Sequence, residues 1–153
     1  MRGARCEVRG KSEDQVRGAR HEVRRSSKAE TEVSGSDFRD LEVWKKAKQL
    51  AIAVYGLTAD GPLARDFGLR DQMRRATVSI CSNIAEGNDR NSNKDAARFL
   101  FMAKGSSAEL MAQAEIALGV GYLGKADAER LIANCEEISR MLRGLIKHRE
   151  KSK

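Results

Sequence analysis

The segment SICSNIAEGNDR, residues 79–90, carries polar side chains whose types and spacing could support chemistry. Ser79, Asn83 and Glu86 recur at helical spacing, which places them on one side of a helix. Glu86 and Glu109 could act as an acid–base pair, but no nucleophile motif, phosphate-binding loop or metal-ligand spacing accompanies them. The sequence therefore predicts no enzyme activity, with no catalytic, cofactor-binding or metal-binding residue.

A second polar stripe, on the following helical segment, matches the first stripe in register. A helix turns by about 100° per residue, and on this basis the polar residues of each segment fall within an arc of about 80° of the helix surface. Asn83 lies within the arc of the first stripe. An antiparallel hairpin turning near Ser92 predicts four facing pairs: Glu86 with Arg98, Arg75 with Glu109, Ser79 with Ser106, and Gln72 with Gln113. Because buried charges persist only when they are paired, we interpret the stripes as a structural polar ladder that fixes the register of the hairpin, within or between subunits.

Two clusters of basic residues are candidates for contact with nucleic acid. They are Arg70 and Arg74 on the second helical segment, and Arg140, Arg143, Lys147, Arg149 and Lys151 near the end of the fourth. Cations also complement the negative end of a helix dipole, and this structural interpretation of the second cluster stays open. No aromatic residue is interleaved with the basic ones, so we expect contact with phosphates rather than with bases.

Length and composition predict one soluble domain with a modest core. The chain has 153 residues, of which 41% are hydrophobic and 33% charged, and a formal net charge of +7. No apolar run approaches the ~18 residues of a membrane span, and the N-terminus has no apolar signal-peptide core. Cys6, Cys81 and Cys135 are odd in number and widely spaced. We therefore expect a cytoplasmic protein with free thiols and no membrane association.

Residues 1–36 differ in composition from the rest of the chain. They contain no Phe, Trp, Tyr, Leu or Ile, and RGARCEVR at 2–9 returns as RGARHEVR at 17–24. Such a segment has too little apolar surface to offset its ordering entropy. We predict a disordered, basic, low-complexity tail, with a basic arm that touches nucleic acid as the alternative. The repeat also fits translation of repetitive DNA upstream of the true start.

From residue 37 onward the hydrophobic periodicity is helical in four segments. They span about 40–58, 64–86, 93–119 and 126–149. Gly61 and Pro62 end the first, and Gly87 is a C-terminal stop for the second. NSN at 91–93 supplies an N-cap for the third, and GVGYLGK separates the last two. Short connections between helices of this length predict an all-α, antiparallel up-down-up-down four-helix bundle over residues 37–153.

Several helical segments carry a second apolar arc outside their core stripe. On the second segment it comprises Val78, Cys81 and Ala85, and on the third it comprises Phe101, Ala108 and Ala112. In an isolated bundle these arcs would face water as an apolar patch of the kind that marks interfaces. The periodicity therefore predicts a homo-oligomer, with these six residues at its interface.

Three segments also carry a family resemblance: LEVWKKA, LRDQMRRATVSICSNIAEGNDR and FLFMAKGSSAELMAQAEIA. They resemble signature segments of the four-helix bundle proteins encoded by intervening sequences in bacterial 23S ribosomal RNA genes. The resemblance covers about residues 38–149 and implies a cytoplasmic homopentamer without established enzymatic activity. Cys81 is a departure, since the family usually has proline there, and we expect a straighter helix at this point.

Two functions remain open on these grounds. The first is a basic, oligomeric accessory protein that binds RNA or DNA weakly and without sequence preference. The second is a scaffold whose apolar faces bind a partner enzyme such as a reverse transcriptase, because the architecture is similar to the accessory subunit of diversity-generating retroelements. Salt distinguishes them, since phosphate binding weakens steeply as salt rises and apolar association does not.

Overall fold

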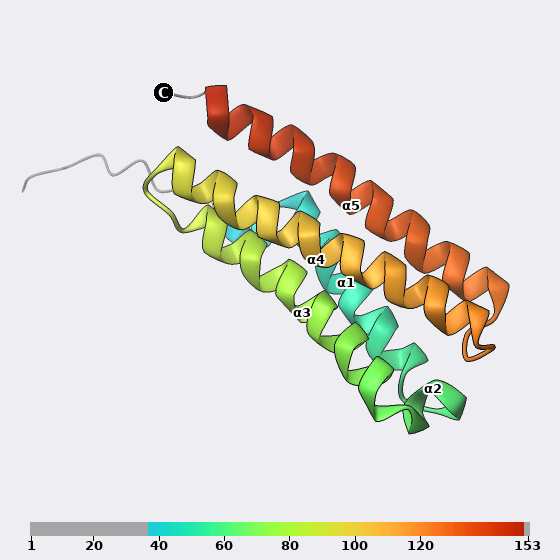
Figure 1. Cartoon of the computed structure of the whole chain (residues 1–153). Helices are drawn as coiled ribbons and strands as arrows, with labels where there is room; N and C mark the ends of the chain where they lie inside the picture. Colours follow the sequence, from blue (N-terminus) through green and yellow to red (C-terminus); the bar gives the residue numbers. More distant parts are fainter. Residues whose placement is uncertain (1–36, 152–153) are drawn as a thin grey trace, which may run out of the picture. The chain divides into compact units, whose positions relative to one another are not determined.

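The computed structural model describes residues 37–151, and its regular secondary structure over that range is entirely helical (Figure 1). The long helices are α1 (Glu42–Leu57), α3 (Phe67–Asn88), α4 (Asn93–Gly119) and α5 (Lys125–Lys151). A 3-10 turn, η1 (Phe38–Asp40), precedes α1, and a short helix, α2 (Gly61–Arg65), joins α1 to α3. The predictions for residues 1–36, including Cys6, lie outside the described residues.

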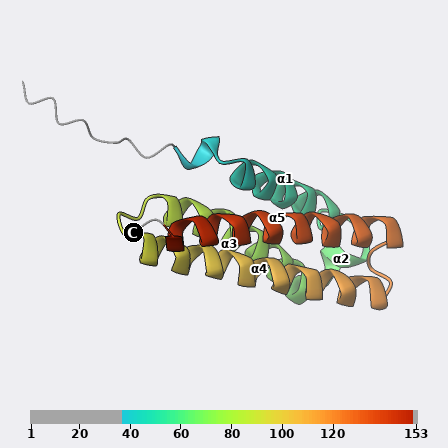
Figure 2. The same cartoon turned by 90° about the horizontal axis from the view of Figure 1, so that it is seen from above.

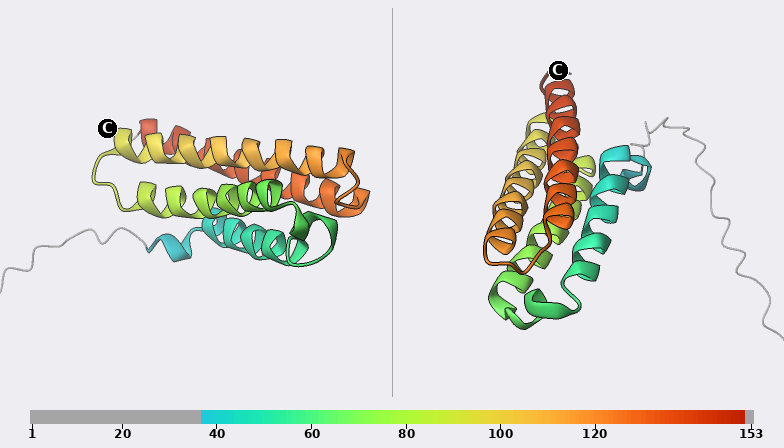
Figure 3. Two further views of the ribbon diagram at one scale, coloured as in Figure 1. Left: turned by 60° about the horizontal axis from the view of Figure 1, so that its bottom comes forward. Right: turned by 90° about the vertical axis from the view of Figure 1, so that its right-hand side faces the viewer.

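The long helices form a four-helix bundle in which consecutive helices run in opposite directions (Figures 1 and 2). Helix α3 packs between α1 and α4, and α5 packs between α4 and α1. Figure 3 shows α2 at the end of the bundle where α1 leads into α3. This arrangement confirms the predicted fold. Within residues 37–151 no helix combines the length and apolarity that a membrane span needs.

The apolar stripes of the four long helices meet in one core. Its largest fully buried side chains include Leu50, Met73, Ile80, Ile84, Leu100, Leu110, Leu131, Ile138 and Leu142. Full burial of such a side chain stabilises the fold by about 1.5–3 kcal/mol. Tyr55 of α1 lies outside this core and is 46% exposed.

Local hydrogen bonds explain where the long helices begin and end. The Asp66 carboxylate accepts the Leu69 backbone N–H at 3.0 Å and caps α3, and Ser92 caps α4 as predicted. After α4, Gly121 adopts a φ of 76°. The following N–H, of Tyr122, then donates to the Ala117 carbonyl at 2.8 Å. This Schellman geometry favours glycine because the left-handed conformation is strained for other residues.

The connection between α1 and α3 differs from the sequence prediction. Helix α1 ends at Leu57, before Gly61 and Pro62, and these two residues begin α2, with proline in its first turn. Proline suits that position because its missing N–H has no intrahelical partner there. The second long helix consequently starts at Phe67 and not near residue 64.

Gly87 was predicted to terminate a helix, and this was wrong, because α3 continues through it to Asn88. The glycine instead permits close packing of α3 against α4. A Cβ atom at position 87 would lie 3.1 Å from the Ala96 carbonyl oxygen and 3.2 Å from the Phe99 Cβ atom. The absence of a side chain therefore lets the two helices approach each other beside their connecting turn.

Candidate functional site

The centre of the predicted polar ladder forms between α3 and α4. The hydroxyl oxygens of Ser79 and Ser106 lie 2.8 Å apart, so these two residues share a hydrogen bond across the hairpin. The Asn83 amide donates to the Ser79 carbonyl at 2.8 Å and to the Ser79 hydroxyl at 3.1 Å. Ser106 is buried. The register predicted for the hairpin is therefore correct at this pair.

The predicted ion pairs between these helices do not form within the chain. Glu86 instead forms a salt bridge with Arg90, four residues further along. The Arg90 guanidinium also lies 4.6 Å from the centre of the Phe99 ring. Arg98 is exposed and is absent from the salt bridges of residues 37–151. A local partner costs less side-chain entropy than a cross-helix partner on a solvent-exposed edge.

The remaining predicted charge pair, Arg75 with Glu109, is likewise missing from the salt bridges within residues 37–151, and both side chains are exposed. Gln72 is exposed too, whereas the Oε1 atom of Gln113 is buried and accepts no hydrogen bond within the described residues. The polar stripe is thus a short serine–asparagine network with charged residues in solvent on either side. Neither Glu86 nor Glu109 has the buried setting typical of a tuned acid or base.

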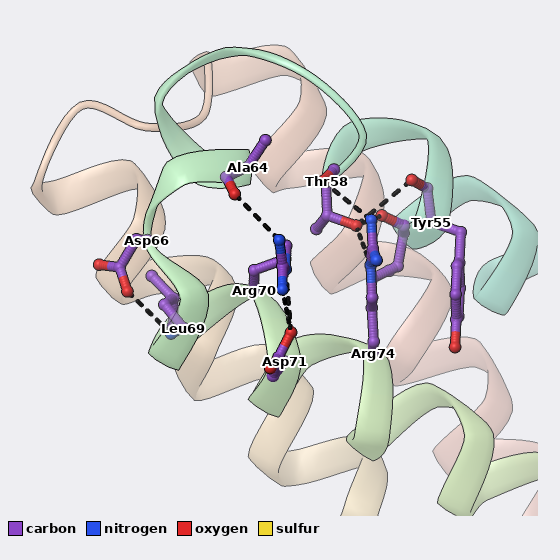
Figure 4. Close-up of polar contacts among 9 residues, drawn as sticks. Tyr55, Thr58, Ala64, Asp66, Leu69, Arg70, Asp71 and Arg74 are labelled. Carbon is purple, nitrogen blue, oxygen red and sulfur yellow. Dashed lines mark hydrogen bonds and ion pairs between the residues drawn. The ribbon is translucent and has the colours of Figure 1, made fainter.

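Arg74 has a structural role at the C-terminal end of α1 (Figure 4). Its guanidinium donates to the Thr58 hydroxyl at 2.8 Å and to the Thr58 carbonyl at 2.9 Å. It also lies 4.8 Å from the centre of the Tyr55 ring. Thr58 is fully buried, and its hydroxyl donates in turn to the Val54 carbonyl at 2.7 Å. Arg74 therefore donates hydrogen bonds to Thr58 oxygens at the end of α1, where a helix leaves such groups without partners. This structural role argues against the predicted role of Arg74 as a nucleic-acid contact.

Arg70 is engaged in a similar way beside α2 (Figure 4). Its guanidinium donates to the Ala64 carbonyl at 3.2 Å and to the Asp71 carboxylate at 2.9 Å. It also lies 4.7 Å from the centre of the exposed Phe67 ring. With its charge neutralised locally, Arg70 is a poor phosphate ligand, and the first basic cluster is better explained by folding.

The second basic cluster remains available to solvent. Arg140, Arg143, Lys147 and Lys151 are exposed along α5, and no salt bridge of residues 37–151 involves them. Arg149 is half-buried, and its guanidinium donates to the Asn93 side chain at 3.4 Å. The second half of α5 thus presents a run of cations near the start of α4.

The apolar residues predicted for an interface lie at or near the surface. Val78 is 46% exposed and Phe101 51% exposed, Ala108 and Ala112 are exposed, and Cys81 and Ala85 are half-buried. Met102 and Ile116 on α4, and Val120 at its C-cap, are also exposed, although the sequence did not lead us to assign them to the interface. The signal was present, because Ile116 and Val120 continue the sequence series from Ala112 at intervals of four residues.

The two cysteines in the described part of the chain, Cys81 and Cys135, are free thiols. Burial raises the pKa of each thiol to about 11, and for Cys135 a hydrogen bond with Ser107 opposes part of this effect. Such thiols are poor nucleophiles at neutral pH because the thiolate is the reactive form. No group of three or more metal-ligating side chains occurs within residues 37–151.

The fold and these surfaces define a small all-helical bundle whose exposed chemistry lies on outward helix faces. The family model of the 23S rRNA-intervening sequence proteins matches residues 39–144, and the chain belongs to this family. A solved protein of unknown function from Bacteroides thetaiotaomicron, of the S23 ribosomal protein family, has the same fold. It is 23% identical with a TM-score of 0.64, and the match covers 69% of this chain and 98% of that one. Comparison with curated proteins gives no match.

Proposed function

We propose that this protein is a non-enzymatic, homo-oligomeric helical scaffold that binds nucleic acid weakly and without sequence preference. The observation that carries the proposal is the outward surface of α4, called here the α4 face. It comprises Met102, Gly105, Ala108, Ala112 and Ile116 together with the C-cap residue Val120, all of them exposed. Phe101 is kept apart from this face because it lines a cavity shared with α5. Burial of the exposed half of each large side chain would contribute about 1 kcal/mol, and the small residues between them would let another helix approach closely.

A second apolar surface, the α1–α3 face, is formed by other helices than the α4 face, and two of its residues, Cys81 and Ala85, are half-buried. It comprises Tyr55, Val78, Cys81 and Ala85, and Tyr55 and Val78 line one cavity of about 550 Å³. A ring with cyclic symmetry needs two unlike surfaces on each subunit, so that each subunit contacts its neighbour head to tail. We infer that the α4 face of one copy packs on the α1–α3 face of the next. The family resemblance supplies the expected number of subunits, which is five.

Two matched substitutions test this association. Ala112→Glu places a charge in the centre of the α4 face, whereas Ala133→Glu places the same charge on the exposed surface of α5. Both positions are solvent-exposed within one chain, so neither change should disturb the bundle itself. Sedimentation velocity should show dissociation for Ala112→Glu only. Equal sedimentation of both variants and the unmodified protein would place the interface elsewhere.

The nucleic-acid part of the proposal is supported by the exposed cations of α5. Arg140, Arg143, Lys147 and Lys151 can contact phosphates without breaking any ion pair within residues 37–151. Contacts of this kind give dissociation constants of about 10⁻⁴–10⁻⁶ M near physiological salt. An oligomer would present several copies of the cluster, which raises the apparent affinity for a long strand.

Salt dependence tests this part. Replacing Arg143 and Lys147 with glutamine should weaken binding of a single strand at low salt. It should also reduce the slope of log affinity against log salt by about 0.7 for each phosphate that the variant no longer neutralises. Arg65→Gln, at an exposed position of α2 near the other end of the bundle, is the matched control. Binding that persists at high salt, or an unchanged slope, would contradict the proposal.

The alternative function is a scaffold that binds a partner enzyme, such as a reverse transcriptase, through its apolar faces. The observation that favours this alternative is that each chain has two apolar surfaces, the α4 face and the α1–α3 face. An assembly that uses only one of them leaves the other for a different protein. Recovery of the native complex from cells, with and without nuclease, distinguishes the two functions. A protein partner that remains after nuclease treatment and high salt supports the scaffold, whereas loss of all partners with nuclease supports nucleic-acid binding.

A further inference from the structure

A surface cavity of about 950 Å³ lies where α4 begins and α5 ends. Lys94, Arg98 and Phe101 line it from α4, and Arg149 and Glu150 line it from α5. Its volume is at the upper end of the range of about 300–1,000 Å³ that is usual for small-molecule sites. The space is large enough for a base with its sugar and phosphate.

The charged side chains of the cavity favour an anion, though only moderately. Lys94 and Arg98 are exposed, and the Arg149 guanidinium is held beside α4 by its hydrogen bond to Asn93 at 3.4 Å. Asp95 and Glu150 also line the cavity, so the cations outnumber the carboxylates by one. No salt bridge within residues 37–151 neutralises the three cations. Phosphate can therefore approach them, and the opposing carboxylates keep the attraction weak.

Phe101 adds an apolar surface among these cations. Its side chain is 51% exposed. The contacts of Asn93 with Arg149 and of Ser107 with Ser139 fix the antiparallel register of α4 and α5. In this register Phe101 lies level with residues 141–145, the turn of α5 that carries Arg143. Folding thus brings an aromatic ring into the same cavity as Arg149 of the basic run, although no aromatic residue is interleaved with that run in the sequence.

We propose that this cavity binds one nucleotide of a single-stranded nucleic acid, with the base stacked on Phe101 and the phosphate contacted by Arg98 and Arg149. The neighbouring phosphates of the strand then follow the exposed cations of α5 from Lys147 towards Arg140. Every base has a π-face, so stacking of this kind holds a strand without selecting its sequence. The inference rests on the proposed nucleic-acid binding and adds a site and a preference for unpaired bases.

Paired oligonucleotides separate stacking from charge. Binding of an oligothymidylate is compared by fluorescence anisotropy with binding of an abasic strand that has the same number of phosphates, at low salt. The unmodified protein should bind the base-containing strand about five- to tenfold more tightly, at the lower end of what stacking on one aromatic residue contributes. Phe101→Leu should abolish this preference and leave the affinity for the abasic strand unchanged.

Phe67→Leu is the matched control, because Phe67 is an exposed aromatic residue of α3 that belongs to neither apolar face and does not line the cavity. It should leave the preference intact. Both variants keep an apolar side chain at the substituted position, and sedimentation of each should match the unmodified protein. A strand carrying 2-aminopurine adds a direct measurement on the unmodified protein, since stacking on Phe101 should quench its fluorescence.

The outcomes distinguish this inference from the proposed function beneath it. Equal binding of both strands, or a preference that survives Phe101→Leu, overturns the nucleotide site but leaves electrostatic binding in place. If a bound strand shows unquenched 2-aminopurine fluorescence, the nucleotide site is likewise overturned and electrostatic binding remains. A protein that binds neither strand at low salt overturns both. Phe101 buried by a neighbouring subunit would give the first of these results.

Discussion

Replacing Arg74 with methionine should lower the free energy of unfolding by about 2–3 kcal/mol. The Arg74 guanidinium donates to the hydroxyl and carbonyl oxygens of Thr58, which is fully buried, and stacks on Tyr55. Hydrogen bonds from a charged donor contribute about 1.5–3 kcal/mol, and a partly exposed cation–π contact adds about 0.5–1 kcal/mol. Methionine retains apolar packing of the stem, which offsets a small part of the loss.

Arg75→Met is the control, because the neighbouring Arg75 is exposed and absent from the salt bridges of residues 37–151. Its effect should stay within about 0.5 kcal/mol. Urea denaturation gives the free energies, and thermal denaturation at equal protein concentration should show Arg74→Met melting about 8–12 °C below the unmodified protein. Equal melting of the two variants would refute the capping role. A loss of nucleic-acid affinity without a loss of stability would restore Arg74 as a ligand of phosphate.

Three further substitutions and one thiol reaction have expected outcomes. Gly87→Ala should lower the free energy of unfolding by about 1 kcal/mol, because overpacking against the Ala96 carbonyl oxygen, 3.1 Å from the added Cβ, outweighs the gain in helix propensity. Gly144→Ala, where an added Cβ meets nothing within 4 Å, should raise the free energy of unfolding by about 0.5–1 kcal/mol. If urea denaturation shows that both glycine substitutions stabilise the protein, or that both destabilise it, the close packing of α3 on α4 at Gly87 is contradicted. Ser106→Ala should lower it by about 1 kcal/mol by removing the partner of Ser79, and an unchanged urea midpoint would show that the hydrogen bond contributes nothing. Cys81 should react with iodoacetamide about two orders of magnitude more slowly than an ordinary thiol at pH 8, because burial raises its pKa to about 11, and equal rates would refute the burial of this thiol.

Much of the fold could be predicted because its signals are local. The periodic stripes identified the four long helices, and the Ser92 cap together with the glycine-rich turn after residue 119 located both ends of α4. Helix α2 was missed because five residues carry almost no periodicity and its glycine and proline resemble a stop signal. Gly87 was misinterpreted because a glycine that permits close packing has the same local signature as one that ends a helix.

The candidate surfaces were predictable only in part. Hairpin register follows from sequence, so the contact of Ser79 with Ser106 could be predicted. The partner of Glu86 could not, because an exposed side chain can reach several cations, and Arg90, just beyond the end of α3, is the nearest along the chain. The role of Arg74 depends on a contact with Thr58, 16 residues away, and no local pattern distinguishes a capping arginine from a free one. Pairwise contacts across the fold decide which cations are available to a ligand.

The most direct test of the central claim is the mass of the protein in solution. Light scattering across a concentration series in the micromolar range should give a constant mass several times the 16.9 kDa of one chain. The proposed ring of five predicts a mass five times that of the monomer. A smaller closed oligomer would retain the association of apolar faces and refute the number taken from the family. A mass of 16.9 kDa at every concentration would contradict the account, because the α4 face would then lie in solvent without a second copy to cover it.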